Sequence, residues 1–167
     1  SDYKDFPDRA DALYNAAVAL QSTEQFKRAA LLFQKYTKLF KDRPDVPEVF
    51  FNSALVWEQA KDDRRMKRTF NEFIRKYGSK KEQGGRVVQI YSKFSDQLWD
   101  ELVTLKSKPP KRRSQLRRWS KSVKNARKKV DRFVDKTLDE YKKRGFAPQS
   151  VEAAYAAKAH FRKLEAE

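Results

Sequence analysis

The side chains that most often carry out acid–base, nucleophilic or metal chemistry are sparse in this chain of 167 residues. It contains no cysteine, which excludes disulfides, thiolate metal sites and thiol catalysis. His160 is the single histidine, and it has no acidic residue at a metal-ligand spacing. Neighbouring carboxylates such as Asp62 and Asp63 diverge by about 100° on a helix, so they do not form an acid–base pair unaided. The sequence therefore predicts no enzyme, no catalytic or metal-binding residue and no cofactor.

Side chains suited to peptide binding recur at a fixed interval. Asn15, Asn52 and Gln89 lie 37 residues apart, and each follows an apolar or aromatic residue. Amides can pair with the backbone of an extended peptide, while Tyr14 and Phe51 could receive its side chains. In the alternative interpretation, the amides tie neighbouring helices together and the C-terminal helices cover the aromatic rings.

Positive charge is concentrated in one segment. The chain holds 39 Lys and Arg against 23 Asp and Glu, a formal net charge of +16. Residues 106–145 contain 17 basic and 4 acidic residues, so they supply most of this excess. Such a segment can attract an acidic protein surface, nucleic-acid phosphates or anionic lipid heads. The predicted anionic-partner patch consists of Lys111, Arg112, Arg113, Arg117, Arg118, Lys121, Lys124, Arg127, Lys128, Lys129 and Arg132.

Hydrophobic spacing predicts helices as the elements that position these residues. Apolar residues recur at helical intervals through almost the whole chain, and only 4 glycines are present, too few for the tight turns of a strand-rich fold. Residues 42–47 form a break, whereas 114–144 contain no proline or glycine and predict one helix of about 30 residues. Thr23 is expected to cap a helix that follows it, and Ser150 the last one. Seven antiparallel helices are predicted, none apolar enough to span a membrane.

The interval of 37 residues extends beyond the amides. Residues 14–17 align with 51–54, and Leu20, Phe33 and Tyr36 align with Trp57, Phe70 and Phe73. Each unit is predicted to be a helix, a short turn and a second helix. This pattern resembles the tetratricopeptide repeat (TPR) family. In its frame Leu13, Ala17, Leu20, Ala29 and Phe33 occupy the repeat positions of the first unit, and Phe50, Ala54, Trp57, Met66 and Phe70 those of the second, where Met66 replaces the family's small residue.

The resemblance also shows departures. The turn glycine is replaced by Glu24 and Lys61, and the link between repeats is about three residues longer than in the family. The carboxylate clamp of chaperone-docking members is absent, because only Asn52 matches it. The long links are similar to those of bacterial cell-envelope members, such as outer-membrane assembly lipoproteins and gliding or cell-division proteins, which implies a periplasmic or envelope location, with the cytoplasm as the alternative.

The resemblance implies an all-α solenoid of antiparallel helix hairpins. We predict a single domain over 1–167, with repeats at about 8–44, 45–81 and, in part, 82–106, followed by a long basic helix and a C-terminal helix in 107–167. It is expected to be part of a larger protein. The first helix of each repeat would line a concave groove for a partner segment. The groove residues are Tyr14, Asn15, Val18, Phe51, Asn52, Leu55, Val88 and Gln89.

These features predict a non-catalytic protein–protein interaction scaffold, with a groove for a partner segment and a basic helix for an acidic partner. The alternative is a nucleic-acid-binding helical protein that uses the basic helix 111–132. Trp119 and Phe133 fall in the apolar seam of that helix rather than among its cations, so stacking on nucleic-acid bases is not indicated. A structural spacer inside a longer repeat array is a third hypothesis. The sequence leaves the oligomeric state open.

Overall fold

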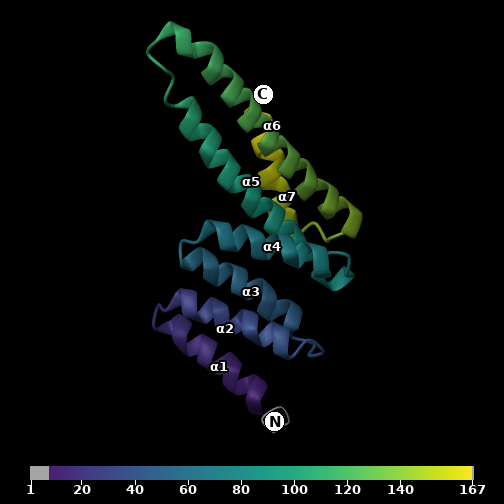
Figure 1. The fold of residues 1–167 in the computed structure, drawn as a ribbon. Coiled ribbons are helices and arrows are strands. Elements are labelled where there is room, and N and C mark those ends of the chain that lie inside the picture. The colour runs from purple at the N-terminus through teal and green to yellow at the C-terminus, as the bar shows by residue number, and fades with distance from the viewer. Residues whose placement is uncertain (1–7, 167) are drawn as a thin grey trace. The chain divides into compact units, whose positions relative to one another are not determined.

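A computed structural model describes residues 8–166, and their regular secondary structure is entirely helical (Figure 1). This confirms the all-α prediction. The α-helices of this part of the chain are α1 (Asp8–Ser22), α2 (Phe26–Leu39), α3 (Val46–Gln59), α4 (Asp63–Tyr77), α5 (Gly84–Lys106), α6 (Arg113–Arg144) and α7 (Val151–Ala166), with a short 3₁₀ turn, η2, at Lys81–Gln83. None of these helices is both long and apolar enough to cross a lipid bilayer.

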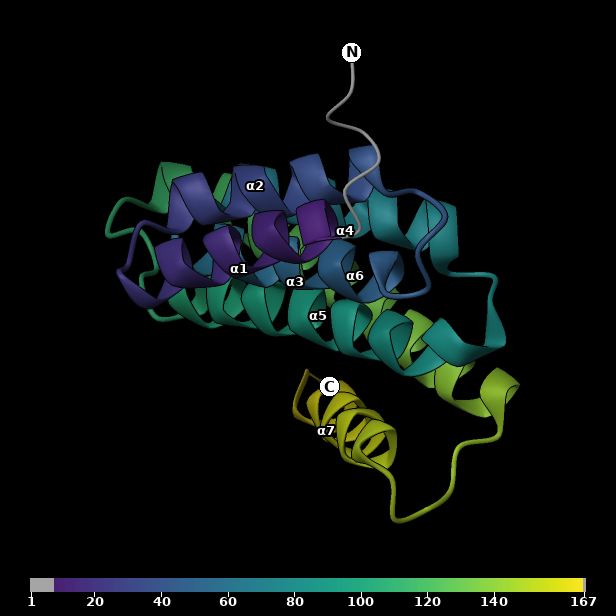
Figure 2. The ribbon, with the colours of Figure 1, turned by 90° about the horizontal axis from the view of Figure 1, so that it is seen from below.

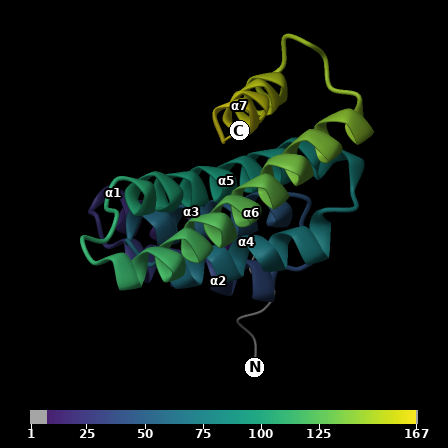
Figure 3. The ribbon, with the colours of Figure 1, turned by 90° about the horizontal axis from the view of Figure 1, so that it is seen from above.

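The contacts divide the chain into two compact units, where the sequence had predicted a single domain. The first unit ends at Gln83 and contains α1 to α4, and the second begins at Gly84 and contains α5 to α7. In the first unit α1 packs on α2, α2 on α3 and α3 on α4 (Figure 1). In the second, α6 runs alongside α5, and α7 packs on both (Figures 2 and 3).

The 37-residue interval reappears as repeated ring packing in the first unit. Tyr14 of α1 lies with its ring centroid 5.6 Å from that of Phe33 of α2, and Phe51 of α3 lies 5.4 Å from Phe70 of α4. Tyr14 also meets Tyr36 at 6.1 Å, as Phe51 meets Phe73 at 5.5 Å. Such aromatic pairs are worth about 0.5–1.5 kcal/mol beyond the area they bury. Each hairpin is therefore closed by the same ring contacts between its two helices.

Small residues let the paired helices approach closely. Ala17 of α1, Ala29 and Ala30 of α2 and Ala54 of α3 are all completely buried. A larger side chain at these positions would push the helices apart, because protein cores are packed without spare volume. Three of these alanines, Ala17, Ala29 and Ala54, occupy positions of the repeat frame described above, and all are core residues.

The turns inside the two hairpins also match. Glu24 and Lys61 have positive φ angles of 59° and 57°. In the following residues, the backbone N–H of Gln25 donates to Leu20 O at 2.8 Å and that of Asp62 donates to Trp57 O at 3.0 Å. This bond from the second residue beyond the helix defines a Schellman-type helix end, in which glycine usually occupies the left-handed position. The glycine missing from the sequence pattern is thus replaced without a change of backbone conformation.

Several predicted helix ends are confirmed and one is wrong. Gly145 ends α6 in the left-handed conformation, with φ of 62°, and Ser150 Oγ accepts from the backbone N–H of Ala153 in the first turn of α7. Thr23 does not cap α2. Its hydroxyl instead donates to Ala19 O at 3.0 Å, in the last turn of α1. The chain reverses only at the next residue, Glu24, which has the left-handed conformation, so Thr23 belongs to the end of α1.

The second unit is built around the inner face of α6. Leu102, Val130, Val134 and Ala159 form its buried cluster, contributed by α5, α6 and α7. At the far end of the hairpin, Trp119 Nε1 donates to Leu105 O at 3.0 Å. That carbonyl lies in the last turn of α5, where carbonyls have no helical partner, so the indole ties α6 to the end of α5.

Glycine at either left-handed turn position should stabilise the protein. Glu24→Gly and Lys61→Gly relieve the steric cost of positive φ for a side chain with a Cβ, and we expect each to raise the free energy of unfolding by about 0.5–1 kcal/mol. Urea denaturation measures this. Ala60→Gly is the matched control, because Ala60 has an ordinary φ of −70°, and there glycine should destabilise. Destabilisation by all three changes would contradict the strained-turn account.

Candidate partner-binding surfaces

The aromatic residues predicted for the groove lie inside the first unit. Phe51 is only 5% exposed, between Phe70 and Phe73 of α4. Tyr14 is half-buried against Phe33 of α2. The prediction that Phe51 receives a partner side chain is therefore wrong, since the second helix of its own hairpin covers the ring. The C-terminal helices are not needed to explain this burial.

The other groove residues of α1 and α3 remain accessible. Asn15 is exposed, Val18 is 42% exposed, and Asn52 and Leu55 are half-buried. Neither Asn15 nor Asn52 makes a side-chain hydrogen bond within the described part of the chain, so the amides do not tie helices together. They are free to pair with a partner's backbone.

The ends of the two helices that carry these amides are fixed by a different contact. Gln21 Nε2 of α1 donates to Gln59 Oε1 of α3 at 2.9 Å. This bond brings the C-terminal ends of the first helices of the two hairpins within hydrogen-bonding distance. We define the α1–α3 face as Asn15, Val18, Asn52 and Leu55.

The remaining predicted groove residues, Val88 and Gln89, belong to α5 in the second unit. Val88 is completely buried, so it is not a surface residue, and Gln89 is half-buried. The prediction fails for Val88 because the N-terminal half of α5 is buried on more than one side, as Val87 and Ile90 are also inaccessible.

The predicted basic patch lies on exposed parts of α6 and the loop before it. Six of its cations follow one another at spacings of four, four, three, four and four residues, which places them on one face of the helix. We call them the basic stripe: Arg113, Arg117, Lys121, Lys124, Lys128 and Arg132, all exposed. At 1.5 Å per residue the stripe is about 28 Å long. The opposite face carries Trp119, Val123 and Val130, which pack toward α5 and the core.

Almost none of this charge is neutralised internally. No Asp or Glu occurs in residues 107–130. Of the eleven predicted patch cations, Arg127 alone has an ion pair within the described residues, with Asp131 at 3.9 Å. On the same face beyond the stripe, Asp135 is held by Lys163 of α7 at 2.8 Å. The first half of α6 is therefore a continuous surface of uncompensated positive charge.

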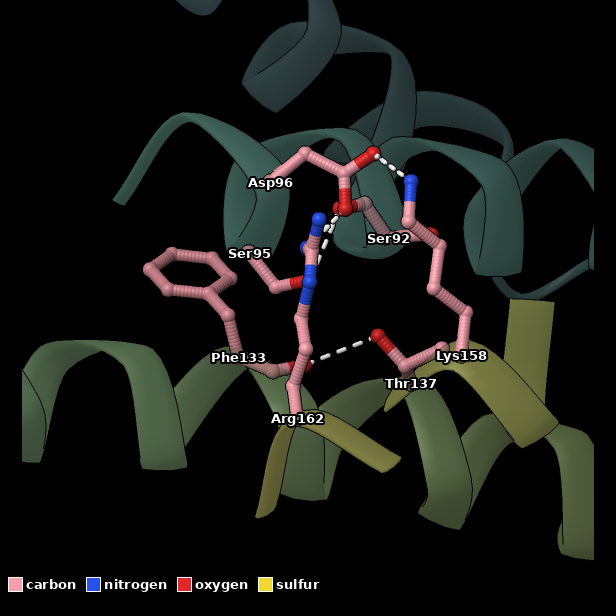
Figure 4. A network of polar contacts seen from close by, with 7 residues as sticks. All are labelled: Ser92, Ser95, Asp96, Phe133, Thr137, Lys158 and Arg162. Atoms are coloured by element: carbon pink, nitrogen blue, oxygen red, sulfur yellow. Dashed lines mark hydrogen bonds and ion pairs between the residues drawn. The ribbon is translucent and has the colours of Figure 1, made fainter. Parts of the chain in front are cut away.

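A second charged group joins α7 to α5 and is fully paired (Figure 4). Arg162 of α7 is 9% exposed, forms an ion pair with Asp96 of α5, and donates to Ser95 Oγ at 3.4 Å. Lys158 Nζ also reaches Asp96, at 2.7 Å. The guanidinium lies 5.9 Å from the centroid of the Trp99 ring. Because these charges satisfy one another, we assign them to holding α7 in place rather than to ligand binding.

A third polar group fastens the link between α2 and α3. The hydroxyl of Tyr36, a completely buried residue, donates to Asp45 Oδ2 at 2.6 Å. Arg43 bridges Asp45 at 3.3 Å and Asp11 of α1 at 3.2 Å. Burial, reinforced by the hydrogen bond to Asp45, raises the pKa of Tyr36 to about 12. For Asp45, burial acts to raise the pKa, but the hydrogen bonds from Tyr36 and Arg43 outweigh it and lower the pKa.

A metal-binding cluster is not found in the part of the chain that the structure describes. No three His, Cys, Asp or Glu side chains lie close enough there to hold a metal ion. His160 is exposed on α7.

One concave site is not predicted by the sequence, whose repeat pattern points to the first helix of each hairpin. We call it the α2–α4 groove, a cavity of about 670 Å³ between the second helices of the two hairpins. Its lining residues are Gln34, Thr37, Lys38, Lys41, Phe50, Arg68, Thr69, Glu72, Lys76 and Tyr77. The signal available in the sequence was weak, because the cations come from separate helices and only packing brings them to one cavity.

Comparison of the chain with protein-family models, curated proteins and solved structures found no match. Similarity to known proteins therefore contributes no functional assignment, and the exposed surfaces carry the functional argument.

The Tyr36 hydroxyl should make stability fall at high pH. Because its pKa is about 12 when folded and about 10 when unfolded, its contribution is complete below pH 10 and is lost as the pH rises to 12. The difference in unfolding free energy between the natural chain and Tyr36→Phe should shrink by roughly 2 kcal/mol over that interval. Denaturation at several pH values measures it. A difference that stays constant would show that the hydroxyl is not buried on Asp45.

The Asp96–Arg162 pair should behave as a partly buried ion pair, because Arg162 is buried whereas the Asp96 side chain is 32% exposed. Asp96→Ala leaves the guanidinium without its carboxylate, and we expect a loss of about 1–3 kcal/mol in the free energy of unfolding, with faster amide hydrogen exchange in α7. Replacing both partners, in Asp96→Ala with Arg162→Met, should recover most of the loss, because no buried charge remains unpaired. Equal losses in the single and double variants would contradict this.

Proposed function

We propose that the chain is a non-catalytic protein–protein interaction scaffold that binds an acidic surface of a partner through the basic stripe of α6. The observation that carries this proposal is the uncompensated charge of the helix. Ten of the eleven patch cations have no acidic partner among the described residues, and all ten are exposed. Solubility is served by charges of both signs interspersed on a surface, so it does not explain a stripe of one sign.

An acidic protein suits the stripe better than a lipid surface. Helices that lie on membranes present a broad apolar face beside their cations. On α6 the large apolar side chains turn inward, and among those described Leu116 alone is substantially exposed, at 42%. The stripe therefore offers charge without the apolar face that membrane insertion needs.

Single-stranded nucleic acid is also a poor match, because its bases bind by stacking on exposed aromatic rings. Trp119 is hydrogen-bonded to α5, and Phe133 packs against Tyr91 and Phe94. Neither ring has a cation of the basic stripe over it, although Lys136 Nζ lies 5.1 Å from the centroid of the Phe133 ring. Duplex phosphates are the remaining alternative, favoured by the absence of any acidic residue in 107–130.

The α1–α3 face supports a second contact with the partner. The unbonded amides of Asn15 and Asn52 supply donors and acceptors for an extended backbone, and Val18 and Leu55 flank them with apolar surface. This part of the proposal retains the groove of the sequence prediction without Phe51 and Val88.

A periplasmic or envelope location is part of the proposal, with the cytoplasm as its alternative. The long links between the repeats, such as residues 40–45 between α2 and α3, support it through their resemblance to envelope proteins of the TPR family.

Removing charge from the stripe should weaken binding to an acidic chain specifically. We expect the variant with Arg117, Lys121, Lys124 and Lys128 changed to Gln to bind a fluorescent oligoglutamate peptide about tenfold or more weakly. Each exposed ion pair contributes a fraction of a kcal/mol, and the loss of four such pairs adds up to about this change in affinity. The matched control changes Arg64, Lys27, Lys35 and Lys142 to Gln. These cations are exposed and have no ion pair within the described residues, and the control should lose no more than about twofold.

The same titrations are made with a duplex DNA of equal charge at several salt concentrations. Tighter binding of the duplex than of the peptide would replace the acidic-protein proposal with nucleic-acid binding. In that case the log of the affinity should fall with the log of the salt concentration, with a slope of about 0.9 per phosphate contacted. Equal losses in stripe and control variants would refute a localised site.

A further inference from the structure

The α2–α4 groove combines features of a ligand site that the proposed function does not use. Its volume of about 670 Å³ lies within the usual range of small-ligand sites, about 300–1,000 Å³. It belongs entirely to the first unit, because every lining residue comes from α2, α3, α4 or the link after α2. It is separate from the basic stripe, which lies in the second unit.

The floor of the groove has an aromatic part, at Tyr77, and a polar part, at Gln34 and Thr69. Tyr77 is half-buried and presents aromatic surface, and its ring centroid lies 5.9 Å from that of Phe50, which is buried beneath the groove. Gln34 Nε2 donates to Thr69 Oγ1 at 3.2 Å, and this bond joins α2 to α4 across the groove. The floor is therefore held in shape and suits a ligand with both an apolar and a polar part.

The rim carries uncompensated positive charge. Lys38 and Lys41 on one side and Arg68 on the other have no ion pair within the described residues. The groove's one acidic lining residue, Glu72, is already paired with Lys76 at 2.7 Å. Lys38 stabilises the last turn of α2, because it lies at the negative end of that helix dipole. Arg68 has no such role, because it lies in the second turn of α4.

The length of the groove indicates an elongated ligand. The α4 lining residues run from Arg68 to Tyr77, a length of about 13 Å along the helix. A single carboxylate or phosphate is too small to occupy that length, whereas four residues of an extended chain span it. We propose that the α2–α4 groove binds an acidic peptide segment in which a large apolar side chain lies between carboxylates. The apolar side chain packs on Tyr77, and the carboxylates pair with Lys38, Lys41 and Arg68.

Direct binding of short peptides to the full chain tests the proposal. The probe is a blocked fluorescent peptide of sequence Glu-Phe-Glu-Asp. One control peptide has Ala for Phe, and another has Gln and Asn for the acids. We expect saturable binding of the probe and about tenfold or weaker binding of each control peptide, because each lacks one of the two matched features.

Variants locate the site. Changing Lys38, Lys41 and Arg68 to Gln should weaken probe binding about tenfold or more, whereas Lys27, Lys35 and Arg64 changed to Gln should leave it within about twofold. Both sets remove two lysines and one arginine from exposed positions of the first unit, so they lower the net charge equally. A dye attached through Asn71→Cys, the sole thiol in the molecule, should report the binding as a change in its fluorescence.

Three results would overturn the proposal. Equal weakening by the groove and control variants would show non-specific attraction to positive charge. Equal binding of the Ala-containing peptide would show that the aromatic floor is not used. Loss of probe binding in the stripe variant of α6, with the groove variant unaffected, would place the peptide on the basic stripe and leave the groove without a ligand.

Discussion

Packing of aromatic rings between the two helices of each hairpin is the constraint on which the first unit depends. Tyr14 meets Phe33, and Phe51 meets Phe70, in the same relation 37 residues apart. Because these rings fill the space between the helices, they are not available to a partner. The surface chemistry of this unit is consequently left to amides and cations, on the α1–α3 face and in the α2–α4 groove.

A similar division governs α6. Its apolar residues, including Trp119 and Val130, turn toward α5 and the core, so every added cation must occupy the outer face. Like charges on one helix face repel one another, and the α6 cations have no acids in 107–130 to offset them. An anionic partner removes that repulsion and gains ion pairs, which is the physical basis for assigning the binding role to the basic stripe.

The fold was predictable where the determinants are local. The uninterrupted helix over 114–144, its end at Gly145 and the cap at Ser150 follow from residue types and their spacing. Thr23 was misplaced because a left-handed residue other than glycine leaves no mark in the sequence. The burial of Phe51 and the existence of the α2–α4 groove depend on how separate helices pack, so periodicity within one helix does not specify them.

We propose that the basic stripe, rather than the protein's charge as a whole, recognises an acidic partner. Nuclear magnetic resonance of the isotope-labelled chain titrated with oligoglutamate tests this, because each backbone amide reports separately. If the stripe is the binding site, chemical-shift changes will concentrate in residues 113–132 and saturate together. Changes of similar size at exposed lysines throughout the chain, or changes that avoid α6, would contradict it.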